Sequence, residues 1–361
     1  MKKRFLAVFL VMVLAVSFVG CGSSDKADDT NAASDTSQKN ETSTSDEGTA
    51  EDATKETVEA KDESTSTSDK KYAMLLKPVS NEYWMAIQTG VEAWAKENGV
   101  IVDVYAAESE DDIVGQLNKM EDIISKEYDG IAIAPLTSVN LISGIIKANE
   151  AGVPVANVDE GVDLEQLKKE AGTMVGFVTT DNYLVGQKAG EFICDQIGEG
   201  EVAVIEGTAG NVTSANRVAG STEYINGVEG CKVVASQPGE WDRIKSLDVA
   251  TNIMQAHPEV KAFYCANDLM ALGVLQAVQN VGKENDIIVI GTDATAGAKE
   301  SIGEDGLVAS VGQANADIAI RCIELLIEAN ENGYTAEPSA DVPVEYIDSF
   351  LVTKENLEEY Q

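Results

Sequence analysis

Short apolar runs alternate with amphipathic stretches along the chain from residue 71 onward. In the first amphipathic stretch, Trp84, Ile87, Val91 and Trp94 recur at steps of three and four residues, and an Asn-Gly pair follows. This spacing predicts a helix that ends at the Asn-Gly pair. The pattern up to residue 158 predicts strands at 72–76, 100–105, 130–134 and 153–158, with helices near 82–98, 111–127 and 139–151.

The same order of elements repeats in the second half of the chain. The pattern there predicts strands at 201–205, 232–236, 260–265 and 286–290, and helices at 213–226, 243–256 and 268–281. Strands that alternate with helices indicate a parallel sheet covered by helices on both faces. The predicted fold class is therefore α/β, with two similar lobes that each contain a doubly wound parallel sheet.

The first 21 residues follow a different pattern. Three basic residues precede an apolar run from Phe5 to Phe18, in which Ser17 is the one polar residue, and the small residue Gly20 precedes Cys21. The run is short for a permanent membrane span, so residues 1–21 are predicted to be a secretory signal. The string FVGC resembles the lipobox of bacterial lipoproteins, which predicts a lipidated Cys21 as the first mature residue. An ordinary signal peptide cleaved elsewhere is the alternative.

Residues 22–70 are rich in Ser, Thr, Asp and Glu and contain no Leu, Ile, Met, Pro or aromatic residue. Such a segment cannot bury enough apolar surface to offset the entropy of ordering, so it is predicted to be a disordered acidic tether. Of the total charge of −36, residues 1–21 contribute +3 and the tether −9, which leaves −30 for residues 71–361. A domain this acidic is repelled by nucleic acid and anionic lipid, so a lipid anchor is the only membrane contact expected.

The remaining cysteines and the single histidine offer little for catalysis or metal binding. Each of the four cysteines lies in or beside an apolar pattern and is expected to be a buried free thiol: Cys194, Cys231, Cys265 and Cys322. His257 alone cannot build a metal cluster or a His-based triad, and no cofactor is expected. The string GTAGN lacks the pattern of a phosphate-binding loop, so it is interpreted as a glycine turn in which Asn211 is a lesser candidate for ligand contact.

Polar and aromatic side chains gather where the predicted strands end. In doubly wound sheets, ligands bind beyond the carboxyl ends of the strands. Aromatic rings cover the apolar side of a sugar ring, and carboxylates, amides, a guanidinium and an ammonium suit hydroxyls, which both donate and accept. The predicted ligand-binding residues are Lys77, Asn81, Tyr83, Trp84, Asp159, Glu160, Arg217, Trp241, Asn267, Asp293 and Gln313.

Several strings within residues 72–354 resemble the ribose-type periplasmic sugar-binding proteins of ABC transporters. They include APLTSVNL, NVDEGVD, FVTTDN, WDRIKSLDVATN, YCAND, GTDA and DSFLVTK, in that order. The resemblance implies a type 1 periplasmic binding protein fold, with two lobes joined by a three-crossover hinge that closes on the ligand. It places the crossings near residues 179–181, 313 and 347–348. The implied N-terminal lobe is 71–179 plus 314–347, and the implied C-terminal lobe is 180–313 plus 348–361.

The resemblance also implies roles for individual residues. Tyr83, Trp84 and Trp241 match the stacking aromatics of the family. Lys77 and Glu160 match the allose-type pattern, because ribose-type proteins have an arginine at the position of Glu160. Positions that hydrogen-bond sugar hydroxyls in the family match Asn81, Asp159, Arg217, Asn267, Asp293 and Gln313. The chain departs from the family pattern at Ala294, where glycine is common, and just after Gln313, where alanine and asparagine replace the usual asparagine and proline.

These features predict a monomeric, extracytoplasmic lipoprotein on the outer face of the bacterial cytoplasmic membrane. It is expected to capture a monosaccharide, D-allose or a relative such as ribose or psicose, and to deliver it to an ABC transporter permease. A sugar sensor that presents its ligand to a chemoreceptor or sensor kinase is the alternative. A glycoside-processing enzyme is less favoured, because it needs two carboxylates at a set separation. Asp159 and Glu160 are neighbours that are expected to point to opposite sides of an extended segment.

Overall fold

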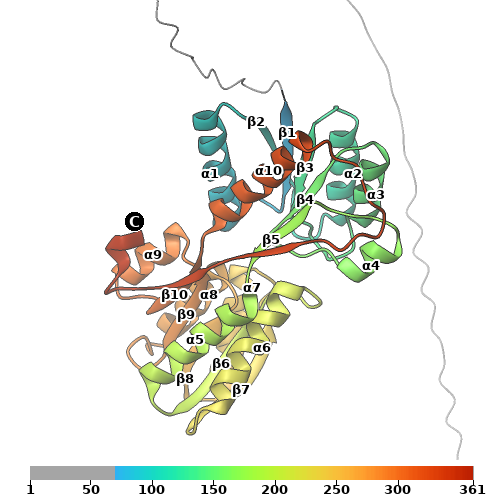
Figure 1. Ribbon diagram of the computed structural model, residues 1–361. Coiled ribbons are helices and arrows are strands. Elements are labelled where there is room, and N and C mark those ends of the chain that lie inside the picture. The colour runs from blue at the N-terminus through green and yellow to red at the C-terminus, as the bar shows by residue number, and fades with distance from the viewer. Residues whose placement is uncertain (1–69, 361) are drawn as a thin grey trace, which may run out of the picture. The chain divides into compact units, whose positions relative to one another are not determined.

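The structure is a computed structural model that describes residues 70–360. The predicted signal peptide and nearly all of the predicted tether lie outside these residues. Between residues 70 and 360, no helix is both long enough and apolar enough to cross a membrane. This part of the chain forms two six-stranded sheets with helices on both faces (Figure 1).

The first sheet consists entirely of parallel strand pairs. Its order is β11 (Val344–Ile347), β5 (Gly176–Thr180), β4 (Val155–Val158), β3 (Gly130–Ile133), β1 (Lys71–Leu76) and β2 (Ile101–Ala106). Helices α1 (Glu82–Asn98) and α10 (Asn315–Glu331) pack on one face. Helices α2 (Ile113–Ile124), α3 (Ile142–Glu150) and α4 (Leu164–Lys169) pack on the other.

The second sheet repeats this plan with one antiparallel edge, between β10 and β12. Its order is β12 (Ser349–Thr353), β10 (Ala309–Gln313), β9 (Ile288–Asp293), β8 (Val260–Cys265), β6 (Gly200–Glu206) and β7 (Cys231–Pro238). One face is covered by α5 (Asn182–Ile197) and α6 (Val212–Gly227). The other is covered by α7 (Arg243–Ala256), α8 (Asp268–Asn280) and α9 (Ala296–Gly303), and the chain ends near the short helix η1 (Leu357–Tyr360).

The chain passes between the two sheets three times: from β5 to α5, from β10 to α10, and from β11 to β12. The predicted fold class, with two doubly wound lobes and a three-crossover hinge, is confirmed. The residue limits assigned to each lobe stay a prediction. In each sheet the strand order reverses beside the first strand, between β1 and β3 and between β6 and β8. Loops that leave neighbouring strands on either side of such a point diverge and create a binding crevice.

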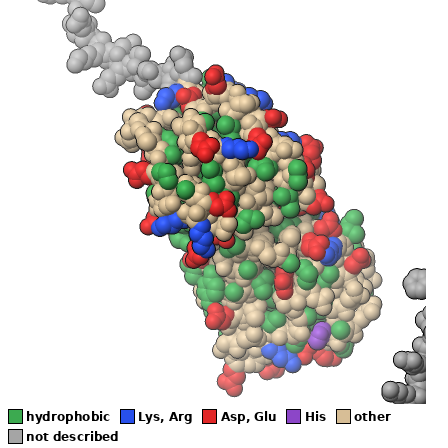
Figure 2. Space-filling model, turned by 90° about the vertical axis from the view of Figure 1, so that its right-hand side faces the viewer, with side chains coloured by type: hydrophobic (Ala, Val, Ile, Leu, Met, Phe, Trp, Pro, Cys, Tyr) green, Lys and Arg blue, Asp and Glu red, His purple; other side chains and the backbone are tan. Residues whose placement is uncertain are grey.

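The central strands are nearly continuous apolar runs because helices bury both of their faces. In β1, Ala73 to Leu76 are fully buried, and β6 buries Val202 to Ile205 in the same way. The prediction for the cysteines is also confirmed, since all four in the described part of the chain are buried and free. Acidic side chains are spread over both lobes on the face shown in Figure 2, in keeping with the negative charge of residues 71–361.

Candidate functional site

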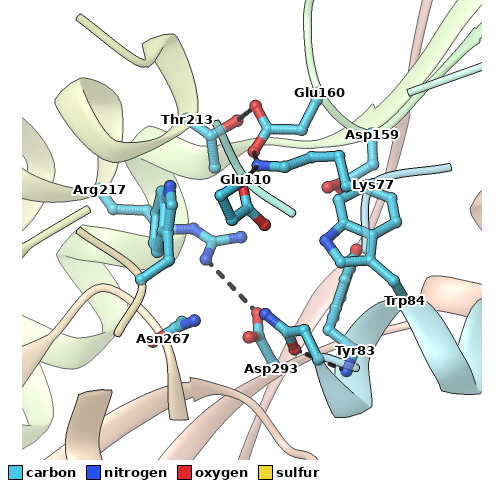
Figure 3. Close-up of a pocket in the computed structure, with 12 residues that line it drawn as sticks. Lys77, Tyr83, Trp84, Glu110, Asp159, Glu160, Thr213, Arg217, Asn267 and Asp293 are labelled. Atoms are coloured by element: carbon cyan, nitrogen blue, oxygen red, sulfur yellow. Dashed lines mark hydrogen bonds and ion pairs between the residues drawn. The ribbon is translucent and has the colours of Figure 1, made fainter. Parts of the chain in front are cut away.

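Ten of the eleven predicted site residues line one pocket between the two lobes. The cavity volume of the pocket is about 30 Å³, so its lining side chains pack closely around little free space. Figure 3 shows Tyr83 and Trp84 on one side and Arg217 and Asn267 on the other. The ten are Lys77, Asn81, Tyr83, Trp84, Asp159, Glu160, Arg217, Trp241, Asn267 and Asp293. That they bind a ligand stays a prediction.

Two tryptophans enter the pocket from opposite lobes. Trp84, in the first turn of α1, meets Tyr83 edge to face at a centroid distance of 5.1 Å. Trp241 lies in the loop before α7 with a left-handed backbone, φ 60°. Its ring occupies the space next to Gly207, the residue that follows β6, since a Cβ on Gly207 would lie 2.1 Å from the ring. The indole Nε1 of Trp241 is buried and has no hydrogen-bond partner among the described residues.

Two asparagines have their side chains fixed by helix capping. The Oδ1 atom of Asn81 accepts from the Tyr83 backbone N–H at the start of α1 (3.0 Å). The Oδ1 atom of Asn267 accepts from Met270 at the start of α8 (2.9 Å). Capping uses the amide oxygen of each residue and fixes its orientation, so the NH₂ group of each is left to donate into the pocket.

Lys77 is the centre of an ion-pair network that connects the lobes. Its Nζ lies 2.9 Å from Glu110 and 3.3 Å from Glu160, and the side chain is almost fully buried. Glu160 also accepts from Thr213 of the second lobe (3.2 Å; Figure 3). A further hydrogen bond comes from Asn211 of the same lobe (2.9 Å). Although burial lowers the pKa of Lys77, the carboxylates of Glu160 and Glu110 raise it above its usual value. The ammonium is therefore charged, and Glu160 links the two lobes without any ligand atom.

Two aspartates face Arg217 across the pocket. The Arg217 Nη1 atom lies 3.4 Å from Asp293 and donates to the Ala266 carbonyl (2.7 Å), while its Nε donates to Asn182 (2.8 Å). Burial, with Glu160 adding to it and Arg217 opposing it, raises the pKa of Asp159 to about 6. Burial also raises the pKa of Asp293 well above its usual value, against the effect of Arg217. Two buried carboxylates beside one guanidinium thus favour ligand groups that donate hydrogen bonds.

Gln313 is the predicted site residue that does not line this pocket. It ends β10 at the second crossover, and its amide donates to Asp293 Oδ1 at 2.8 Å. Its own Oε1 is buried without a partner among the described residues. In this conformation Gln313 therefore supports Asp293.

The expectation that Asp159 and Glu160 point to opposite sides is wrong, since both line the pocket. The argument assumed an extended backbone, but Asp159 has a left-handed φ of 56°. Backbone strain of this kind costs about 1–3 kcal/mol and is concentrated at functional sites. Here the strain turns two neighbouring carboxylates toward the same cavity.

Two pocket residues were not among the predicted set, Glu110 and Thr213. Glu110 follows the end of β2, so the strand-end rule applied to that strand as well would have found it. Thr213 lies in the first turn of α6, immediately after the GTAGN turn. Asn211, the lesser candidate in that turn, caps α6 and donates to Glu160.

Comparisons with known proteins agree with this architecture. Residues 72–333 match the family model of the periplasmic binding protein domain. The chain is 45% identical over 285 residues to the D-allose-binding periplasmic protein of Escherichia coli (strain K12), covering 78% of this chain and 92% of that protein. It is 35% identical over 236 residues to the ribose import binding protein RbsB of Bacillus subtilis (strain 168), covering 65% and 73%.

A solved structure gives the same picture. An ABC transporter periplasmic solute binding protein from Actinobacillus succinogenes 130z, crystallised with bound D-allose, aligns with a TM-score of 0.74 at 30% sequence identity. The alignment covers 81% of this chain and all of that one. The chain therefore belongs to the periplasmic binding protein family, as an extracytoplasmic substrate-binding protein and not an enzyme.

Proposed function

We propose that this protein captures a monosaccharide between its lobes and delivers it to the permease of an ABC transporter. The main support is the pairing of Trp84 and Trp241 from opposite lobes around a small pocket lined with hydrogen-bonding groups. A sugar ring has C–H faces that stack on aromatic rings and an edge of hydroxyls that needs donors and acceptors. The pocket offers both kinds of contact, and all eleven predicted residues have a place in this proposal, Gln313 through Asp293.

The preferred sugar is proposed to be D-allose or a related hexose or pentose such as ribose or psicose. Relatives named for D-allose and for ribose both match the chain. The Lys77–Glu160 pair favours the allose-type assignment, because ribose-type proteins have an arginine at the position of Glu160. A buried ammonium held by two carboxylates presents its remaining proton to the pocket as a hydrogen-bond donor.

The protein is further proposed to be a monomer attached by lipid on Cys21 to the outer face of the cytoplasmic membrane. Support comes from the basic start, the apolar run and the FVGC string of the first 21 residues. Lipidation predicts that Cys21→Ser releases the protein into the medium. Retention of that variant at the membrane would contradict the anchor without touching the sugar-binding proposal.

Titration of the purified protein with a sugar panel tests the binding proposal. Two of the three tryptophans line the pocket, so D-allose, ribose, psicose, xylose and galactose are compared by tryptophan fluorescence and by calorimetry. We expect saturable binding with D-allose or a close relative as the tightest ligand. No binding of any pentose or hexose would refute the proposal.

Substitution of Trp241 tests whether the sugar binds in this pocket. We expect Trp241→Ala to weaken binding by about 2 kcal/mol or more, the scale of a buried tryptophan hot spot. Trp241→Phe retains an aromatic face and should retain most of the affinity. Unchanged affinity in Trp241→Ala would mean that the sugar binds elsewhere.

A deletion strain that loses uptake but keeps chemotactic signalling would favour transport over sensing.

A further inference from the structure

Asp268 is a fully buried carboxylate that does not line the pocket but lies next to it in sequence and space. It is the first residue of α8 and directly follows the pocket residue Asn267. Its Oδ1 accepts from the Ser310 hydroxyl in β10 (2.7 Å), and its Oδ2 accepts from the Thr295 backbone N–H (2.8 Å). The side chain therefore ties the start of α8 to β10 and to the loop after β9.

Ser310 extends this connection by one further bond. While its hydroxyl donates to Asp268, its Oγ accepts from the backbone N–H of Ala294 at 2.9 Å. Two consecutive backbone N–H groups, those of Ala294 and Thr295, are thus held by the Asp268–Ser310 pair. Both follow the pocket residue Asp293 directly.

The held loop has an unfavourable backbone. Asp293 has φ 116° and Ala294 has φ 50°, in the region where a Cβ atom costs about 1–2 kcal/mol per residue. Glycine adopts this region freely, so Ala294 needs an external restraint that glycine would not need. The hydrogen bond from its own N–H to Ser310 provides such a restraint.

A glycine in β9 makes room for the Asp268 carboxylate. A Cβ on Gly291 in β9 would lie 2.1 Å from Asp268 Oδ1, so the absence of a side chain there admits the carboxylate. Asp293, at the end of the same strand, is then directed at Arg217 and Gln313. The orientation of this pocket carboxylate depends on contacts that the ligand never makes.

We propose that Asp268 and Ser310 are positioning residues that hold the strained 293–295 loop, so that Asp293 is preorganised to accept from a ligand hydroxyl. This inference rests on the proposed sugar-binding function. Neither residue touches the ligand, and both act through the backbone of Ala294 and Thr295. A glycine at position 294 would adopt the left-handed backbone without strain. With alanine there, the hydrogen bonds of Asp268 and Ser310 hold the loop in that conformation.

The test uses Ser310→Ala, Ala294→Gly and the double variant, compared with the wild-type full-length protein. Ser301→Ala is the matched control, because Ser301 also accepts a loop N–H, from Leu307 (3.0 Å), in the same lobe but away from the pocket. Affinity for the tightest-binding sugar of the panel is measured by calorimetry. Amide hydrogen exchange at residues 294 and 295 is measured without sugar.

We expect Ser310→Ala to weaken sugar binding about tenfold, because it leaves the partly buried N–H of Ala294 unpaired and releases the strained loop. Exchange at residues 294 and 295 should accelerate. Ala294→Gly alone should bind about as well as the wild type, and adding it to Ser310→Ala should restore most of the lost affinity. Ser301→Ala should leave sugar affinity unchanged.

Three outcomes would overturn the proposal: unchanged affinity in Ser310→Ala, unchanged exchange at 294 and 295, or no rescue by Ala294→Gly. If Ser310 had a purely structural role, Ser310→Ala would lower thermal stability, and adding Ala294→Gly would not restore sugar affinity. Failure of the underlying function is distinguishable, because the wild-type protein would then bind no sugar while the exchange readout would still respond to Ser310→Ala.

Discussion

Under the proposed function, we expect Asp159 to make sugar affinity depend on pH. Burial raises its pKa to about 6, and a sugar hydroxyl that donates to the carboxylate favours the charged form. Below pH 6 the protein must therefore lose a proton to bind. We expect affinity to fall about tenfold from pH 7.5 to pH 5, with little change above pH 7.

Calorimetry of the sugar complex across this pH range checks the prediction. The raised pKa of Asp293 acts in the same direction, so Asp159→Asn should flatten the profile in part and lower the affinity throughout. Affinity that rises toward pH 5 would mean that Asp159 donates to the ligand as a protonated acid. Proton release on binding, measured in buffers of different ionisation enthalpy, separates these two cases.

At the scale of single residues, the sequence predicted well which residues line the pocket, but it predicted their backbone conformations poorly. The aromatics and amides were found because they follow predicted strands, and the strand-end rule needs no atomic detail. The left-handed backbones of Asp159, Trp241 and Asp293 were not predictable, because tertiary contacts such as those of Ser310 and Gly207 impose them. Nor did the sequence show that Gln313 would hydrogen-bond Asp293 in this conformation.

At the scale of elements, α5 and α6 approach closely because glycines face each other across the contact. A Cβ on Gly220 would lie 2.0 Å from the Tyr183 carbonyl oxygen, and one on Gly186 would lie 2.1 Å from that of Arg217. We expect Gly220→Ala to destabilise the protein by about 1–3 kcal/mol. It should also weaken sugar binding, because Arg217 lies one turn earlier on α6 and would move with the helix.

Gly227, the last residue of the same helix, is the matched control, since no atom lies within 4 Å of a Cβ placed there. Gly227→Ala should keep both wild-type stability and wild-type affinity. Denaturant unfolding and sugar titration of the two variants provide the comparison. If Gly220→Ala matched Gly227→Ala in both measurements, the close helix contact would be unimportant.

The apolar repeat of the sequence predicts where a helix begins and ends only when capping residues mark its ends. The prediction of 82–98 agrees with α1 because an Asn cap and a terminal Gly mark both ends. The predicted 111–127 was too long, since Asp112 caps Gly115 and α2 ends at Ile124. The six-residue helix α4 was absent from the prediction, because so short an element has no apolar repeat that distinguishes it from a loop.

At the scale of the whole molecule, each lobe has an exposed aliphatic residue close in sequence to a pocket residue. Val114 is 71% exposed and Ile244 is 73% exposed, and each lies within four positions of a pocket residue, Glu110 and Trp241 respectively. Under the proposed function, we expect these two side chains to contact the transporter permease.

We expect Val114→Asp combined with Ile244→Asp to abolish sugar uptake while leaving sugar affinity within about twofold of the wild type. The matched control is Val281→Asp, because Val281 is half exposed at the far end of α8. Uptake by a deletion strain that carries each variant, together with titration of the purified proteins, distinguishes the two effects. Normal uptake with the double variant would exclude this surface as the docking site.

The contacts that Glu160 makes to Asn211 and Thr213, and the one from the Gly297 N–H to Glu82 (3.0 Å), join the lobes without any sugar. Direct contacts between the lobes lower the free energy of the closed form and so raise its population before the sugar binds. The apparent dissociation constant then depends on the population of the closed form without sugar, as well as on the contacts between the sugar and the pocket. Changes to a contact outside the pocket, such as that between Glu82 and Gly297, can therefore tune uptake to the sugar concentration of a habitat while leaving the choice of sugar untouched.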